Sequence, residues 1–280
     1  MPNITIDLNK SIEENASLYF EKAKKLKKKI AGAEAIIEQT KRKIEREGRK
    51  KEAEIESEEI VPDRKKQWYE KFRWFISSEG FLVIGGRDAT SNEIIIKKNA
   101  EKDDIVFHTD MAGSPFFLVK KDSINGKEIG ESTINETANA TCSFSRAWKL
   151  GMSTSDVFFV KPDQVTKEAN AGEYISKGAF MIKGKTNYIK NEMDLAIGLF
   201  DGAVMAGPLN AIKTHCKKYI IVEQGSGKSS NAAKMVKKEV GGSIDEIIRA
   251  LPSGGIKVAV EHENKRTKNK KRKISGKKSR

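Results

Sequence analysis

A group of charged and amide side chains follows the apolar run at residues 81–84. Arg87 and Asp88 come directly after Gly85-Gly86, and Asn92 and Glu93 follow within about one helical turn, where a predicted strand gives way to a predicted helix. Side chains of these types either cap a helix and bridge to one another, or face a ligand and bind its polar groups. The residues alone favour capping.

A second group, His108-Thr109-Asp110, follows the apolar run at residues 105–107. His108 and Asp110 are alternate residues and share one face of an extended chain, which suits proton transfer. The alternative, which we favour, is a structural histidine that is satisfied within the fold. No Ser, His and Asp have the spacing of a nucleophilic triad, and two Cys with three His are too few for a metal-stapled fold. We therefore expect neither an enzyme nor a cofactor.

The segment Gly225-Ser226-Gly227-Lys228-Ser229 looks like the end of a phosphate-binding loop between a strand and a helix. Such a loop needs a further glycine five positions before Gly227, and Val222 stands there. We therefore reject a nucleotide-hydrolysing site, which leaves an RNA-phosphate contact or a structural turn.

The charge of the chain lies at its two ends. The 280 residues include 53 Lys and Arg against 39 Asp and Glu, a net charge of +14. Residues 21–51 hold thirteen basic and five acidic residues, and residues 265–280 hold ten basic and no acidic residues. Cationic segments on either side of a near-neutral middle suit a polyanion, because each Lys or Arg placed on a phosphate releases a counterion. The alternative is that the tails serve solubility.

No apolar run approaches the length of a membrane helix, and the N-terminus lacks the order of a signal peptide, so we expect a cytoplasmic protein.

Residues 11–58 predict one long helix. Ser11 and Glu14 fit a capping box, and ahead of them Ile4, Ile6 and Leu8 alternate with polar residues as in a short strand. A stripe of small and apolar residues continues at steps of four and three through Ile12, Ala16, Tyr19, Ala23, Leu26, Ile30, Ala33, Ile37, Thr40 and Ile44. Such a narrow stripe on a charged helix is typical of a coiled coil and predicts a partner helix. A lone solvated helix is the alternative.

The rest of the chain predicts an α+β fold with a mixed or antiparallel sheet, because strands outnumber helices and short turns join them. A hairpin is expected at residues 72–84, with its turn at 77–80. Further strands are expected at residues 105–107, 116–119, 156–160, 179–182, 195–200, 219–222 and 256–260. Helices are expected at residues 64–71, 91–100, 133–150, 230–239 and 243–251.

Several motifs in this body resemble one family. They are the run 74–89, Asn92-Glu93, His108-Thr109-Asp110, Ser145-Arg146-Ala147-Trp148, Val165-Thr166-Lys167, Gly172-Glu173-Tyr174 and the run 178–182. In order and spacing they resemble the NFACT-R (DUF814) domain, the RNA-binding module of the NEMF, FbpA and Caliban family. One departure is Ser91, where the family usually has Gln.

The resemblance implies a factor of ribosome-associated quality control, which binds the large ribosomal subunit, its rRNA and tRNA when a nascent chain has stalled. It also implies a truncated form that lacks the N-terminal NFACT-N half. The expected domains are a coiled-coil segment at 1–62, the NFACT-R domain at 63–200, a small α/β extension at 201–263 and a disordered basic tail at 264–280.

On this basis we expect RNA contacts from ten residues: Arg87, Asp88, Asn92, Glu93, His108, Asp110, Arg146, Lys161, Lys183 and Lys185. The coiled coil would pair with a separate N-terminal NFACT polypeptide or with a second copy. The alternatives are a coiled-coil scaffold for protein interactions, and an enzyme that processes RNA or nucleotides.

Overall fold

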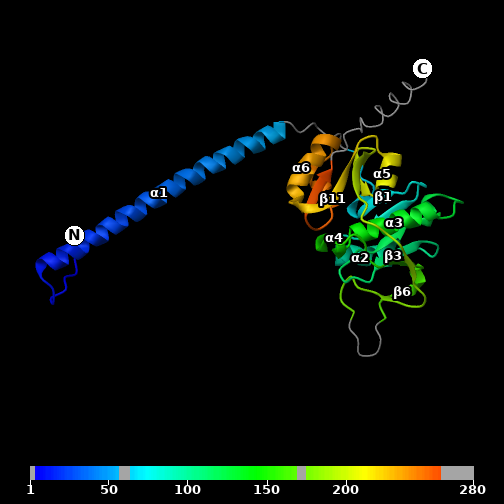
Figure 1. Cartoon of the computed structure of the whole chain (residues 1–280), viewed down its shortest axis with the longest axis horizontal. Helices are drawn as coiled ribbons and strands as arrows, with labels where there is room; N and C mark the ends of the chain where they lie inside the picture. Colours follow the sequence, from blue (N-terminus) through cyan, green and yellow to red (C-terminus); the bar gives the residue numbers. More distant parts are fainter. Residues whose placement is uncertain (1–3, 57–63, 169–174, 260–280) are drawn as a thin grey trace, which may run out of the picture. The chain divides into compact units, whose positions relative to one another are not determined.

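The computed structural model describes residues 4–56, 64–168 and 175–259, with residues 47–56 as backbone alone. The chain divides into two compact units, Met1–Asp63 and Arg64–Arg280 (Figure 1). The tail expected at 264–280 lies outside the described residues.

The first unit is built on one helix, α1 (Ile12–Glu56), as the heptad pattern predicts. The predicted capping box is present: the Ser11 hydroxyl accepts the Glu14 N–H at 3.1 Å, and the Glu14 carboxylate accepts the Ser11 N–H at 2.8 Å. Two amides that a helix start leaves unpaired are thereby satisfied.

The strand expected at residues 4–8 is wrong, because this segment forms a loop that folds onto the start of α1. Its backbone pairs with side chains of the helix instead of a neighbouring strand. The Asp7 N–H donates to the Asn15 side chain at 2.9 Å, and the Tyr19 hydroxyl donates to the Thr5 carbonyl at 2.6 Å. The alternating apolar residues are exposed and contribute nothing to a core.

The apolar stripe of α1 has no cover among the described residues. Leu26, Ile30 and Ile37 are each more than half exposed. Exposed apolar side chains at heptad spacing are typical of helices that pair in coiled coils.

The second unit contains a six-stranded antiparallel sheet in the order β1-β2-β4-β3-β5-β8. Its strands are β1 (Arg73–Ile76), β2 (Leu82–Gly85), β3 (Ile105–Thr109), β4 (Phe117–Val119), β5 (Val157–Val160) and β8 (Asn187–Ile189). The predicted hairpin is β1-β2, in which Arg73 pairs with Gly85 and Ile76 with Leu82. Gly80 completes the turn at a φ of +98°, a conformation that favours glycine.

A second antiparallel sheet has the order β10-β9-β11-β12, and β6 pairs with β7 as a small ribbon. The strands are β9 (Ala196–Phe200), β10 (Ala203–Gly207), β11 (Tyr219–Gly227), β12 (Ile256–Ala259), β6 (Val165–Thr166) and β7 (Met181–Ile182). The fold is therefore α+β with antiparallel sheets, as predicted. Gly225-Ser226-Gly227 lies within β11, and the next helix begins two residues later at Ser229.

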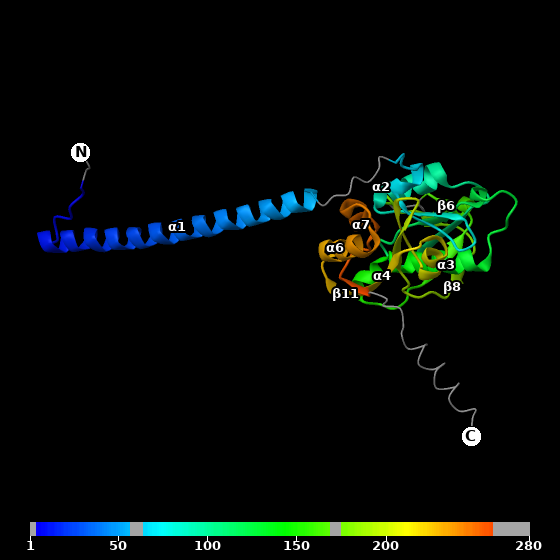
Figure 2. The same ribbon diagram turned by 90° about the horizontal axis from the view of Figure 1, so that it is seen from above.

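Helices cover the two sheets. The α-helices are α2 (Ala89–Ile94), α3 (Glu131–Ser143), α4 (Arg146–Leu150), α5 (Leu209–His215), α6 (Ser229–Val240) and α7 (Ile244–Ala250). Single turns of 3-10 helix lie at Trp68–Lys71, Lys121–Ser123 and Pro162–Gln164, and a π-helical turn at Ile95–Asn99 continues α2. Helix α3 packs on β3, β4 and β5, and α6 and α7 lie side by side over the second sheet (Figure 2). None of the described helices has the length and apolar character needed to cross a bilayer.

The helix expected at 133–150 is interrupted, because Ser145 ends α3 and caps α4. Its hydroxyl donates to the Cys142 carbonyl at 2.7 Å and accepts the Ala147 N–H at 3.1 Å. The serine hydroxyl competes for backbone hydrogen-bonding groups in this way, so serine is unfavourable inside a helix and favourable at its N-cap.

Both sheets contribute to one hydrophobic core, in which Phe75, Phe107 and Phe117 lie with Ile197 and Met205. The boundary expected at residue 200 falls inside the β9-β10 hairpin, where Phe200 pairs with Ala203.

Candidate nucleic-acid interface

A cavity of about 530 Å³ lies where β1, the end of β2, the start of α2, the loop before β4 and α4 meet. We call it the arginine cavity, after its charged lining of five cations and one carboxylate: Arg73, Arg87, Arg146, Lys149, Lys177 and Asp88. The carboxylate is already engaged as the N-cap of α2, where it accepts the Ser91 N–H at 2.8 Å. The cavity is therefore suited to an anion.

Arg73 is positioned on β1 with its guanidinium over the ring of Phe144. Its carbon Cζ lies 4.3 Å from the centre of the Phe144 ring, and Nη1 donates to the Leu251 carbonyl at 3.1 Å. Burial, with a smaller contribution from Arg87, lowers the pKa of Arg73 to about 9. The side chain still carries its charge at pH 7, and it has no ion pair with any described residue.

Arg87 follows β2 and is half-buried beside Arg73. Its Nε atom is buried and has no hydrogen-bond partner among the described residues. Burial lowers the pKa of Arg87, as does Arg249, while Asp88 opposes this. A partly dehydrated guanidinium among other cations is costly for the fold, and an anion offsets that cost.

Asn92 connects α2 to the loop before β4. Its Oδ1 accepts the Phe116 N–H at 3.1 Å, and its Nδ2 approaches the Ser114 carbonyl at 3.5 Å. Gly86 lies so close that an added Cβ would stand 1.8 Å from the Asn92 Oδ1. Asn92 therefore sets the shape of the cavity wall.

Glu93 does not line the cavity. It forms ion pairs with Lys167 at 2.8 Å and Lys97 at 3.1 Å and accepts the Gly178 N–H at 3.2 Å. These bonds, that of Lys167 first, lower the pKa of Glu93 to about 2. Glu93 thus fastens the segment that carries Lys177 to α2.

His108 lines the cavity but has local partners. Its ring stacks on Phe116 with centroids 4.0 Å apart, and Nε2 lies 3.2 Å from the Ser114 carbonyl, to which it donates. Burial lowers the pKa of His108, so the ring is neutral at pH 7. Asp110 lies outside the cavity and accepts the Tyr188 hydroxyl at 2.9 Å. This favours a structural histidine over a proton shuttle.

The three predicted lysines Lys161, Lys183 and Lys185 lie away from the cavity, around the Gln164 side chain. That side chain accepts the Lys161 N–H at 3.0 Å and donates to the carbonyls of Lys183 and Lys185, both at 2.9 Å. The structure therefore brings five of the ten predicted residues to the arginine cavity: Arg87, Asp88, Asn92, His108 and Arg146. Their contacts with RNA stay a prediction.

Residues 71–184 match the family model of the NFACT protein RNA binding domain. This range includes all five cations of the arginine cavity. The chain carries a domain of the NFACT-R family.

Curated relatives of this NFACT-R chain are much longer. The chain is 41% identical over 203 residues to the archaeal Rqc2 homolog aRqcH of Methanocaldococcus jannaschii, a match that covers 70% of this chain and 30% of that protein. It is 37% identical over 200 residues to the ribosome quality control complex subunit NEMF homolog of Drosophila melanogaster, a match that covers 70% of this chain and 20% of that protein. It is 37% identical over 179 residues to the ribosome quality control complex subunit NEMF of Homo sapiens, a match that covers 62% of this chain and 16% of that protein.

Three cations of the arginine cavity, Arg73, Lys149 and Lys177, are not among the ten residues predicted from the sequence. Arg73 interrupts the apolar run 72–76, and a charge in a buried strand is a signal that we did not use. Lys149 stands three residues after Arg146, so both share one face of α4.

Replacing Asn92 with Ala should weaken the NFACT-R fold locally. The Phe116 N–H would lose its acceptor, and an unsatisfied buried donor costs about 1–3 kcal/mol. We expect the midpoint of urea unfolding to fall, with faster hydrogen exchange at residues 110–116. Thr90, which is exposed on the same helix, provides the control: Thr90→Ala should change neither measurement.

Proposed function

We propose that this chain binds RNA through the arginine cavity, as a cytoplasmic component of ribosome-associated quality control. The observation that supports the proposal is the charge of the cavity, in which five cations face one carboxylate that already caps α2. The cations lie within the range that matches an RNA-binding domain, and the Drosophila and human relatives carry ribosome quality control in their names.

The chemistry of the cavity fits a phosphate backbone. Guanidinium groups bind phosphate through paired N–H donors, and Arg73 and Arg87 present such groups side by side. Lys149 and Lys177 add charge at the rim, where they have no ion pair with any described residue. We propose rRNA of the large subunit and tRNA as the RNAs bound, with the tail at 265–280 adding non-specific affinity.

The test is a sucrose gradient of a lysate that contains the tagged protein, followed by sequencing of the RNA that co-purifies. We expect the protein in the large-subunit fractions, with large-subunit rRNA and tRNA enriched. Protein that stays at the top of the gradient at low salt, without rRNA or tRNA, would contradict the proposal.

We further propose that α1 pairs with a partner helix, supplied by an N-terminal NFACT polypeptide or a second copy. The exposed stripe at heptad spacing supports this.

Replacing Leu26 and Ile30 together with Lys should abolish this pairing, because two ammonium groups would enter the seam. Mass measurement by light scattering reads out self-association, and co-purification with the N-terminal polypeptide reads out the other pairing. The variant with Ala31→Lys and Ala35→Lys adds the same charge off the stripe and should behave like wild type. Equal behaviour of the two double variants would exclude a coiled coil through this stripe.

A further inference from the structure

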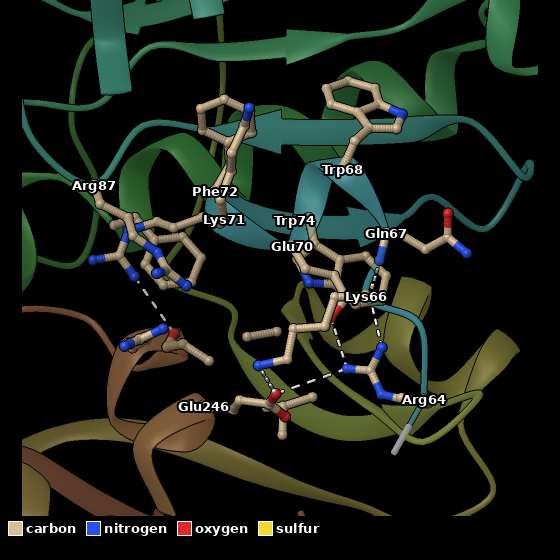
Figure 3. A pocket seen from close by; sticks show the side chains of 16 residues that line it. Arg64, Lys66, Gln67, Trp68, Glu70, Lys71, Phe72, Trp74, Arg87 and Glu246 are labelled. Atoms are coloured by element: carbon tan, nitrogen blue, oxygen red, sulfur yellow. Dashed lines mark hydrogen bonds and ion pairs between the residues drawn. The ribbon is translucent and has the colours of Figure 1, made fainter. Parts of the chain in front are cut away.

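A second cavity, of about 370 Å³, lies beside the arginine cavity and shares Arg73, Arg87 and Phe144 with it. The residues from Arg64 to Trp74, strand β10 and helix α7 enclose it (Figure 3). We call it the aromatic cavity, because Trp68, Phe72 and Trp74 line it. Its volume is within the range of pockets that hold small organic groups.

The charges of the aromatic cavity are separated between two ends. At one end both carboxylates are paired: Glu70 binds Arg64 through two hydrogen bonds of 2.7 Å, and Glu246 lies 3.2 Å from Lys66. Figure 3 shows this cluster on the side away from Arg87.

At the other end Arg73, Arg87 and Arg249 line the cavity, and none of them forms an ion pair with a described residue. The cavity therefore offers an apolar middle and one uncompensated cationic end.

Trp68 gives this cavity an accessible stacking surface. Its side chain is 47% exposed, although it touches Tyr69 and Phe72 edge to face at 5.8 and 6.5 Å. Trp74 and Phe72 are buried, so among these three rings the indole of Trp68 is the one that a ligand can cover. Nucleobases stack on aromatic side chains irrespective of sequence.

We propose that the aromatic cavity takes one unstacked nucleotide of the bound RNA. The base lies against Trp68, and its phosphate lies at the shared wall between Arg73 and Arg87. This inference rests on the proposed function and adds to it a ligand class: single-stranded RNA, or an unpaired end beside a duplex. Duplex RNA alone has no free base to offer, so it fills the arginine cavity only.

The experiment uses a hairpin RNA with a short single-stranded extension, and a series in which an abasic site moves along that extension. Fluorescence anisotropy measures affinity with the full chain. We expect one abasic position to weaken binding about tenfold, the size of a lost base-aromatic stack. 2-Aminopurine at that position should be quenched on binding. Trp68→Ala should remove both effects, while Trp68→Phe, which keeps an aromatic ring, should retain most of them.

The outcomes separate this inference from the proposed function. Failure of wild type to bind any of these RNAs would overturn the proposed function. If wild type bound all the abasic RNAs equally well, and Trp68→Ala and Trp68→Phe bound RNA with the same affinity, the inference would be overturned while RNA binding remained. Adenosine monophosphate is the remaining probe: competition with the base-bearing RNA supports a shared site, whereas binding without competition would assign the cavity to a free nucleotide. Circular dichroism confirms that each variant is folded.

Discussion

Replacing Arg87 with Gln is expected to lower the affinity for RNA by about tenfold to a hundredfold without lowering the stability of the fold. A hydrogen bond to a charged group contributes about 1.5–3 kcal/mol, and each 1.4 kcal/mol corresponds to about a factor of ten in affinity. The guanidinium lies at the wall shared by both cavities, so it contacts any phosphate bound there.

The stability should not fall, because the folded chain leaves this side chain unpaired. Its Nε has no partner in the described part of the chain, and its charged neighbours are Arg73 and Arg249, which are opposed by Asp88. The neutral amide of Gln removes that repulsion, so we expect the free energy of unfolding to stay the same or to rise. RNA affinity and stability therefore separate, which a general folding defect cannot produce.

Two measurements test this expectation: anisotropy titrations with tRNA over a range of salt, and thermal unfolding without RNA. Loss of one phosphate contact should flatten the slope of log affinity against log salt by about 0.7–0.9. The control Lys98→Gln removes a charge from an exposed position outside both cavities. If the two variants weaken binding equally, diffuse charge rather than the cavity holds the RNA.

Local signals predicted those parts of the molecule that local interactions determine. The capping box at Ser11 and Glu14, the heptad stripe of α1 and the turn before Phe81 each depend on residues a few positions apart. The capping role of Asp88 was likewise readable, although α2 begins two residues earlier than predicted. Where a local competitor exists, the periodicity misled us, as with the serine that divides α3 from α4.

The cavity could not be predicted in the same way, because its lining comes from distant parts of the chain. Arg73, Arg146 and Ser253 meet only after both sheets have joined one core. The charge of each residue is visible in the sequence, but whether a carboxylate will stand opposite is a property of the packing. Strands β8 and β10 were missed for a related reason: short strands acquire their structure from the neighbours that pair with them.

Replacing Asp104 with Ala should destabilise the domain by about 3–5 kcal/mol, which is the cost of breaking a buried ion pair from one side. The side chains of Asp104 and Lys120 are 1% and 9% exposed, and their charged atoms lie 2.7 Å apart. The carboxylate also accepts the N–H groups of Glu101 at 2.9 Å and Lys121 at 2.8 Å. Its loss leaves the ammonium of Lys120 with the Asn99 carbonyl and an exposed Glu101. Urea unfolding monitored by circular dichroism measures the change in the free energy of unfolding.

Two further variants identify the cause. Glu128→Ala removes the partner of Lys121 in an exposed ion pair and should cost about 0–1 kcal/mol. The double variant Asp104→Leu with Lys120→Met removes both buried charges and should recover most of the stability. A double variant as unstable as Asp104→Ala would show that the backbone contacts of Asp104, not its charge pair, hold β3 and β4.

A comparison of Lys120 with Arg87 separates a charge that stabilises the fold from a charge that is available to bind RNA. Lys120 is buried and Arg87 is half-buried, and among the described residues a carboxylate forms an ion pair with Lys120 but none does so with Arg87. A buried charge that serves the fold is paired within it, so removing its partner lowers stability and leaves the intrinsic affinity for RNA unchanged. Removing a charge that has no partner within the fold should instead lower the affinity for RNA and leave the stability unchanged. Asp104→Ala should therefore lower the stability but not the RNA affinity, and Arg87→Gln should lower the RNA affinity but not the stability. The same pair of effects in both variants would show that the arginine cavity has no specific role in RNA binding.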